Sequence, residues 1–139
     1  MDEQIKTRLL ASKKAAAMEV NTILNCHRLT ESFVREHIRK YVLCKFMLTE
    51  ADCPTDNMDE ITKISLSHAI KIDRKLIEEV DMAARCDGAN SVIIKKVLLF
   101  MAIRREFDIE FSAGDTAKIT STEDLAMLIC RCLLQKACI

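Results

Sequence analysis

"SVIIKKVLLFMAIRREF", residues 91–107, is the stretch that decides the fold. Apolar residues occupy most of its positions, and neither glycine nor proline interrupts it. A run of this length without breakers predicts an α-helix of several turns. Because the run is apolar on nearly all sides, we expect the helix to lie at the centre of a helical protein.

The rest of the composition agrees with a helical protein. The chain has 139 residues, of which two are glycine, one is proline and none is tryptophan. This length favours one domain, and scarce Gly and Pro favour long helices joined by short connections. We therefore predict an all-α bundle of about five helices.

Charge, the first ten residues, the lengths of apolar runs and the cysteines argue against several classes of protein. Twenty-one basic residues balance 21 acidic ones, which gives no general affinity for nucleic acid. The first ten residues, MDEQIKTRLL, start acidic and lack the apolar core of a signal peptide. No apolar run reaches the roughly 18 residues of a membrane span. The seven cysteines are irregularly spaced, so we expect reduced, buried thiols in a cytoplasmic protein.

Periodicity predicts two helices in the first 50 residues. Apolar residues recur at steps of three, four and seven over 3–25, and a break follows at 25–28. Thr30 or Ser32 can cap a second helix that runs to about residue 50. We expect His37 and Cys44 to share one face of it, but no metal-ligand spacing or catalytic pocket follows from this pair.

Loop and cap signals divide the remaining chain. "ADCPTDN", 51–57, is a loop in which Pro54 ends the preceding helix and Asp56 or Asn57 caps the next. Residues 58–86 form either one long helix or two, with a break near 71–73. Residues 108–118 form a loop with one short helical turn.

The start signal of the last helix occurs twice in succession. Thr120 with Glu123, and Ser121 with Asp124, each match a capping box. Apolar residues then recur at helical spacing from Leu125 onward, which predicts a helix with one inward face.

The C-terminal segment resembles an acyl carrier protein. "EFDIEF…AKITSTEDLAMLI", 106–129, is similar to the exit of the second carrier helix, the loop after it and the start of the last helix. Upstream, "GANSV", 88–92, resembles the family's "GADSL". The apolar positions that match the family are Phe107, Ile109, Phe111, Ile119, Leu125 and Ile129.

The resemblance implies a carrier and not an enzyme. Ser91 would carry covalent 4′-phosphopantetheine, with Asn90 in place of the usual aspartate and Gly88 in the preceding turn. The thiol of that group would hold an acyl or aminoacyl cargo as a thioester. The implied partners are a phosphopantetheinyl transferase and enzymes that handle acyl or aminoacyl groups, with neither nucleic acid nor membrane. The N-terminal helices could also form a homodimer.

Two features depart from the family. Ser91 precedes Phe107 by 16 residues, whereas the family has about fourteen, and two extra helical residues rotate the serine by about 200°. An alignment without a gap puts Ile93 at the serine position. Carriers also present an acidic second helix, whereas Lys95 and Lys96 here would face an acidic partner.

The boundaries of the carrier-like unit follow from the same resemblance. We expect residues 51–139 to form the carrier-like domain, and 1–50 to be an N-terminal helical extension or to include the first carrier helix. Both parts should form one compact unit.

Three alternatives stay open on the sequence. Ser91 could be a plain helix cap, which an Asn-Ser pair before an apolar run commonly is. The chain could then be a helical interaction module without a prosthetic group. It could also be a small bundle that binds a ligand in an apolar cavity.

Overall fold

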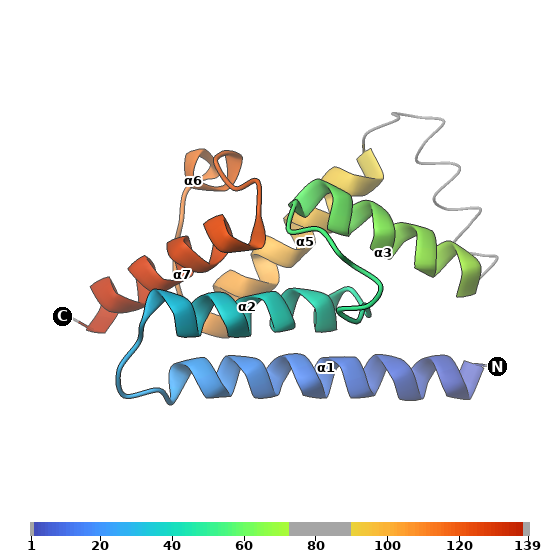
Figure 1. The fold of residues 1–139 in the computed structure, drawn as a ribbon, viewed down its shortest axis with the longest axis horizontal. Coiled ribbons are helices and arrows are strands. Elements are labelled where there is room, and N and C mark those ends of the chain that lie inside the picture. The colour runs from blue at the N-terminus through green and yellow to red at the C-terminus, as the bar shows by residue number, and fades with distance from the viewer. Residues whose placement is uncertain (1, 73–89, 138–139) are drawn as a thin grey trace.

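The protein is all-helical in the computed structural model, which describes residues 2–72 and 90–137. Within these ranges it contains no β-strand, and only an isolated bridge joins Asn57 to Ser121. The all-α prediction is confirmed (Figure 1). The described helices are α1 (Asp2–Leu24), α2 (Glu31–Lys45), α3 (Met58–Ile72), α5 (Asn90–Phe107), α6 (Ala113–Ala117) and α7 (Thr122–Ala137).

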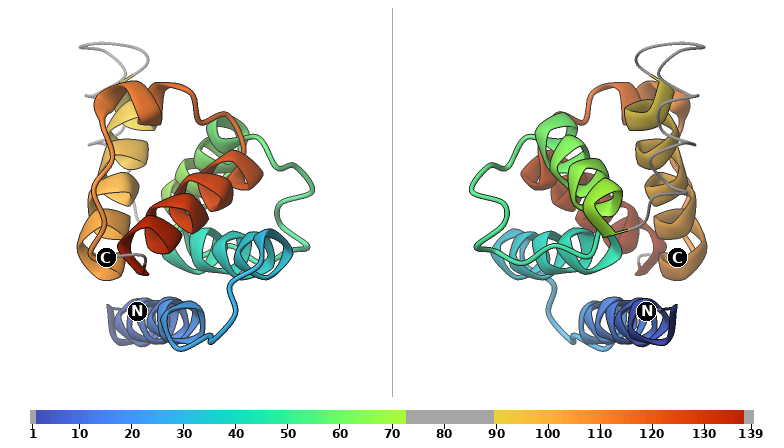
Figure 2. Two further views of the ribbon diagram at one scale, coloured as in Figure 1. Left: turned by 90° about the vertical axis from the view of Figure 1, so that its left-hand side faces the viewer. Right: turned by 90° about the vertical axis from the view of Figure 1, so that its right-hand side faces the viewer.

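The helices are arranged around α2. α1 and α2 form an antiparallel hairpin at one side of the molecule, and α7 packs on α2 from the other side (Figures 1 and 2). α5 lies against α3 and makes only a small contact with α1. None of the described helices combines the length and apolarity that crossing a bilayer requires.

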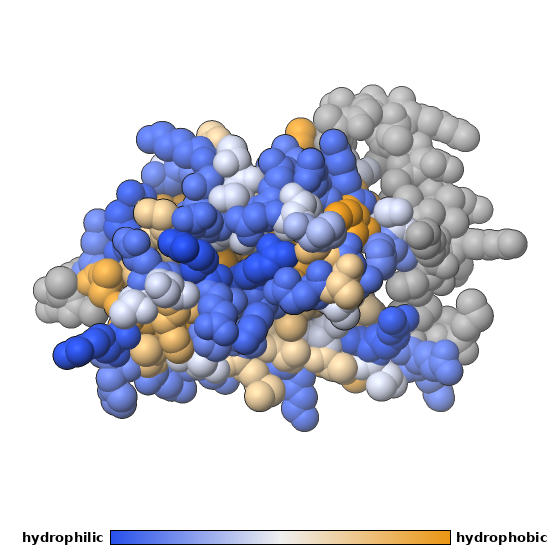
Figure 3. Space-filling view, in the orientation of Figure 1, coloured by the Kyte–Doolittle hydropathy of each residue, from blue (hydrophilic) through white to orange (hydrophobic). Residues whose placement is uncertain are grey.

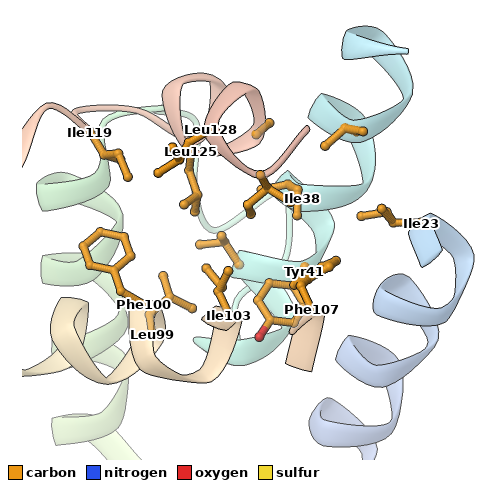
Figure 4. Close-up of a cluster of buried hydrophobic side chains, with 14 of the residues drawn as sticks. Ile23, Ile38, Tyr41, Leu99, Phe100, Ile103, Phe107, Ile119, Leu125 and Leu128 are labelled. Atoms are coloured by element: carbon orange, nitrogen blue, oxygen red, sulfur yellow. The ribbon is translucent and has the colours of Figure 1, made fainter. Parts of the chain in front are cut away.

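The core forms where α2, α5 and α7 meet (Figure 4). Ile38 and Tyr41 of α2 and Ile103 of α5 are fully buried there, together with Leu125 of α7. The Tyr41 and Phe107 rings pack edge to face with their centroids 5.7 Å apart. Helices distant in the sequence are thus held by one shared apolar cluster.

A polar cluster of three side chains lies at the edge of this core. The Tyr41 hydroxyl donates to the Glu106 carboxylate, and Lys45 Nζ lies 3.0 Å from Glu106 Oε1. Burial, followed by the bond to Glu106, raises the pKa of Tyr41. The hydroxyl therefore stays protonated and remains a donor across the α2–α5 contact.

The first helix ends as predicted, but the second ends five residues early. Thr30 Oγ1 accepts from Phe33 N and caps α2. α2 stops at Lys45 because Met47 adopts a left-handed conformation, φ 58°, and Leu48 N donates to Leu43 O. This is the pattern of a Schellman C-cap. Leu48, the residue after this cap, is buried in the core.

The loop 51–57 is confirmed, although Pro54 does not end a helix there. Asn57 Oδ1 accepts from Glu60 N and caps α3, as one of the two predicted candidates. Asp56 acts elsewhere: its carboxylate accepts from the Thr122 hydroxyl and from Glu123 N at the start of α7. The N-termini of α3 and α7 are therefore joined.

Arg39 completes this junction from α2. Its guanidinium donates to both Glu50 carboxylate oxygens, to the Asp56 carboxylate and to the carbonyl oxygens of Cys53 and Thr55, at 2.9–3.2 Å. A planar guanidinium has the donors for such a set in a fixed fork, whereas an ammonium does not. One side chain thus holds the connection from α2 to α3 in place.

Of the two capping boxes predicted at the start of α7, only one half of the Ser121–Asp124 box forms, and the Thr120–Glu123 box does not form. Ser121 Oγ accepts from Asp124 N. The Asp124 carboxylate in turn accepts from the backbone and hydroxyl of Thr120. Glu123 instead pairs with Arg35 of α2, at 3.3 Å. The short turn predicted in 108–118 is present as α6.

The prediction that the apolar helix is central is wrong. α5 lies at the side of the bundle (Figure 2), and one of its faces is exposed. Composition counts apolar residues but does not say how many sides of a helix have neighbours. The large exposed side chains of this face, here called the outer face of α5, are Ile93, Ile94, Val97, Leu98 and Met101.

Replacing Arg39 tests the α2–loop–α7 junction. We expect Arg39→Met to lower the free energy of unfolding by about 2–4 kcal/mol, because it leaves Asp56 and two carbonyl oxygens without this donor. Lys40→Met is the matched control, since Lys40 makes only an exposed pair with Glu36 and should change stability by less than about 0.5 kcal/mol. Urea unfolding measures both. Equal effects would contradict the role given to Arg39.

Candidate functional site at the start of α5

The candidate site centres on Ser91, the second residue of α5. Its side chain is partly exposed. Because α5 begins at Asn90, Ser91 lies in the first turn and does not flank the helix as an N-cap residue does. Gly88 lies outside the described residues, and so does the side chain of Asn90. The roles predicted for these two residues stay predictions.

The helical repeat places Ser91 on the border between two unlike faces of α5. Successive residues turn by about 100°, so the buried Leu99, Phe100, Ile103 and Phe107 share one side. The outer face points away from them. Ser91 lies between these faces, together with Lys95 one turn further on.

The two-residue departure from the carrier spacing persists in the structure. α5 is a continuous helix from Asn90 to Phe107, so no bulge absorbs the extra residues. Ile93, which the gap-free alignment puts at the serine position, lies on the outer face and is 52% exposed. Ser91 is rotated from it by about 200° and faces a different part of the molecule.

The two lysines predicted to bind a partner both make contacts within the chain. Lys96 Nζ lies 2.7 Å from Asp59 Oδ1 of α3. Lys95 Nζ lies 5.1 Å from the centre of the Phe46 ring. Burial lowers the pKa of Lys95. Partner binding by either lysine remains a prediction, and such binding would compete with these contacts.

The two arginines in the last turn of α5 differ in their contacts. Arg104 donates to Glu110 at 2.5 Å and stacks near the Phe111 ring. Arg105 is exposed and forms no ion pair within residues 2–72 and 90–137. At the basic end of α5, the described part of the chain thus offers an ion-pair partner to Arg104 but not to Arg105.

The cysteines and histidines do not assemble into a site in the described part of the chain. No group of three potential metal ligands occurs there. His37 Nδ1 lies 2.6 Å from Glu19 Oε2, and its ring packs beside Phe33. Burial raises the pKa of the Cys44 thiol, which opposes a thiolate nucleophile. His37 and Cys44 are therefore best described as part of the contact between α1 and α2.

A surface depression of about 720 Å³ lies away from Ser91. It is formed by α6, α7 and the first residue of α2. Apolar side chains such as Met127 and Leu134 line it, and Asp115, Arg131 and Glu31 stand among them. The face of the molecule shown in Figure 3 is mostly hydrophilic. The sequence had suggested an apolar cavity only as an alternative, without naming these residues.

Comparisons with models of protein families, with curated proteins and with solved structures found no match for this chain.

A pair of neighbouring leucines tests which side of α5 is buried, and hence where Ser91 faces. Leu99 is 4% exposed and Leu98 is 60% exposed. We expect Leu99→Ala to destabilise the fold by about 2–5 kcal/mol, because it leaves a cavity. Leu98→Ala should cost less than about 1 kcal/mol, because alanine favours the helix and little packing is lost. Thermal or urea unfolding of the two variants measures the difference, and a larger loss at Leu98 would contradict this orientation.

Proposed function

We propose that the protein is a specialised carrier that receives 4′-phosphopantetheine on Ser91 and presents an acyl or aminoacyl cargo to partner enzymes. The observation that carries the proposal is the placement of Ser91. It is a partly exposed serine in the first turn of α5, the helix whose other end leads into the carrier-like segment.

Packing of the carrier-like segment supports the proposal. All six apolar residues that match the carrier pattern are buried in the common core. Asp108 adopts a left-handed conformation, φ 53°, and Ile109 N donates to Arg104 O. This ends α5 sharply and directs Ile109 and Phe111 inward. The apolar residues of this segment thus contribute to the core that α2 and the other helices share.

The chemistry of the first turn suits a phosphodiester. The Ser91 hydroxyl would form the new oxygen–phosphorus bond to the pyrophosphate of coenzyme A. The bond from that phosphorus to the bridging oxygen would break, adenosine bisphosphate would leave, and the hydroxyl proton would pass to a base of the transferase or to solvent. Backbone N–H groups at the start of a helix tolerate the negative charge that results. Once attached, the group supplies a thiol that holds cargo as a thioester.

The implied partners follow from this chemistry. A phosphopantetheinyl transferase must reach Ser91, and enzymes that load or use the cargo must approach the same end of α5. The basic residues of α5 differ from the acidic helix of housekeeping fatty-acid carriers. We therefore assign the protein to a separate biosynthetic pathway.

The outer face of α5 favours a second candidate function, a helical interaction module without a prosthetic group. Its five large apolar side chains are 47–60% exposed. Clustered exposed apolar side chains are a feature of surfaces that bind other proteins. In that case Ser91 would be an ordinary residue of the first turn.

Intact-mass measurement distinguishes the two functions. The folded protein is incubated with coenzyme A, magnesium and a promiscuous phosphopantetheinyl transferase. We expect a gain of one phosphopantetheinyl group, because Ser91 offers the hydroxyl, and complete loss of this gain in Ser91→Ala.

Ser67→Ala is the matched control, since Ser67 is an exposed serine of α3. It should be modified as fully as the unaltered protein. If the unaltered protein gains no mass while circular dichroism shows it folded, the carrier function is wrong and the interaction module becomes the better account.

A further inference from the structure

Lys95 belongs to the candidate site, but the carrier function described so far gives its side chain no role. It lies one turn after Ser91 on the same side of α5. Its ammonium sits over the Phe46 ring, and within the described part of the chain no carboxylate pairs with it. The adjacent Lys96 differs, because it bonds to Asp59.

This placement of a lysine is costly without an anion. An ammonium is strongly hydrated, and moving it out of water favours the neutral form unless a negative group lies close. Burial does lower the pKa of Lys95. The cation–π contact with the Phe46 ring offsets part of this cost.

The register of α5 places a candidate anion site beside Lys95. Residues four apart lie next to each other on one side of a helix, so Lys95 is the neighbour of Ser91 one turn further on. A group attached to the Ser91 oxygen would begin within reach of this ammonium. A serine at position 93 would instead have Val97 one turn further on, on the apolar outer face. The shifted serine and the desolvated lysine thus belong to one side of the helix.

We propose that Lys95 is a positioning residue that binds the phosphodiester attached to Ser91 and holds the base of the arm against Phe46. This inference rests on the proposed function. The ligand is a singly charged phosphodiester, and Lys95 meets it as a point charge, as lysines do with phosphates. The arm would then leave the protein beside the end of α2 and not along the outer face of α5.

Titration of Lys95 in the unaltered protein tests the inference without any substitution. Its ¹³Cε resonance is followed against pH by NMR before and after enzymatic modification, with Lys96 as internal control. We expect the Lys95 midpoint to move to higher pH by about one pH unit on modification, because a nearby opposite charge favours the charged form. The Lys96 midpoint should move much less. An unchanged Lys95 midpoint in fully modified protein would overturn the inference and leave the carrier function intact.

A pair of variants adds a readout on the phosphate itself. Lys95→Met keeps the apolar stem over Phe46 but removes the charge, and Lys96→Met removes the neighbouring charge. In modified protein we expect the ³¹P line of Lys95→Met to be narrower than in the unaltered protein, since the phosphodiester gains mobility, and Lys96→Met to resemble the unaltered protein. Equal line widths in all three proteins count against the inference. Absence of modification at Ser91 would instead overturn the proposed function, and with it the role of Lys95.

Discussion

The fold depends on the junction that Arg39 makes among α2, the loop after it and the start of α7. Its guanidinium bonds to Asp56, and Asp56 accepts from the first residues of α7. Met58 N also donates to Thr120 O. These bonds satisfy polar groups that would otherwise lack a hydrogen-bond partner beside the core. The loop can therefore cross between helices without disrupting the apolar packing. This junction and the shared apolar core together position α3 and α7 relative to α2.

The core adds a second constraint on α5. Tyr41 and Lys45 of α2 both bond to Glu106, and Phe107 packs against the Tyr41 ring. Both contacts lie at the C-terminal end of α5, where Asp108 stops the helix. With this end fixed in rotation, the helical repeat alone determines which way Ser91 faces. A site at one end of the helix is thus oriented by packing at the other.

This orientation connects the proposed function to the inference about Lys95. Carriers place their serine by its spacing from the helix exit, and this chain changes that spacing by two residues. The serine leaves the side where Ile93 is exposed and joins the side where Lys95 lies over Phe46. A cation beside the serine, in place of the acidic surface of fatty-acid carriers, would change both how the arm is held and which partners are attracted.

The sequence by itself determined the helical class, most helix limits and the caps at Thr30, Asn57 and Ser121, because these depend on local hydrogen bonds and periodicity. It also identified Ser91 as the candidate site. Only the tertiary structure decided that α2 ends at Lys45, where Met47 is left-handed and the next residue, Leu48, is buried. It likewise decided that α5 lies at the side and that Lys95 faces Phe46. Such features depend on which helices become neighbours, and no local pattern in the chain specifies its neighbours.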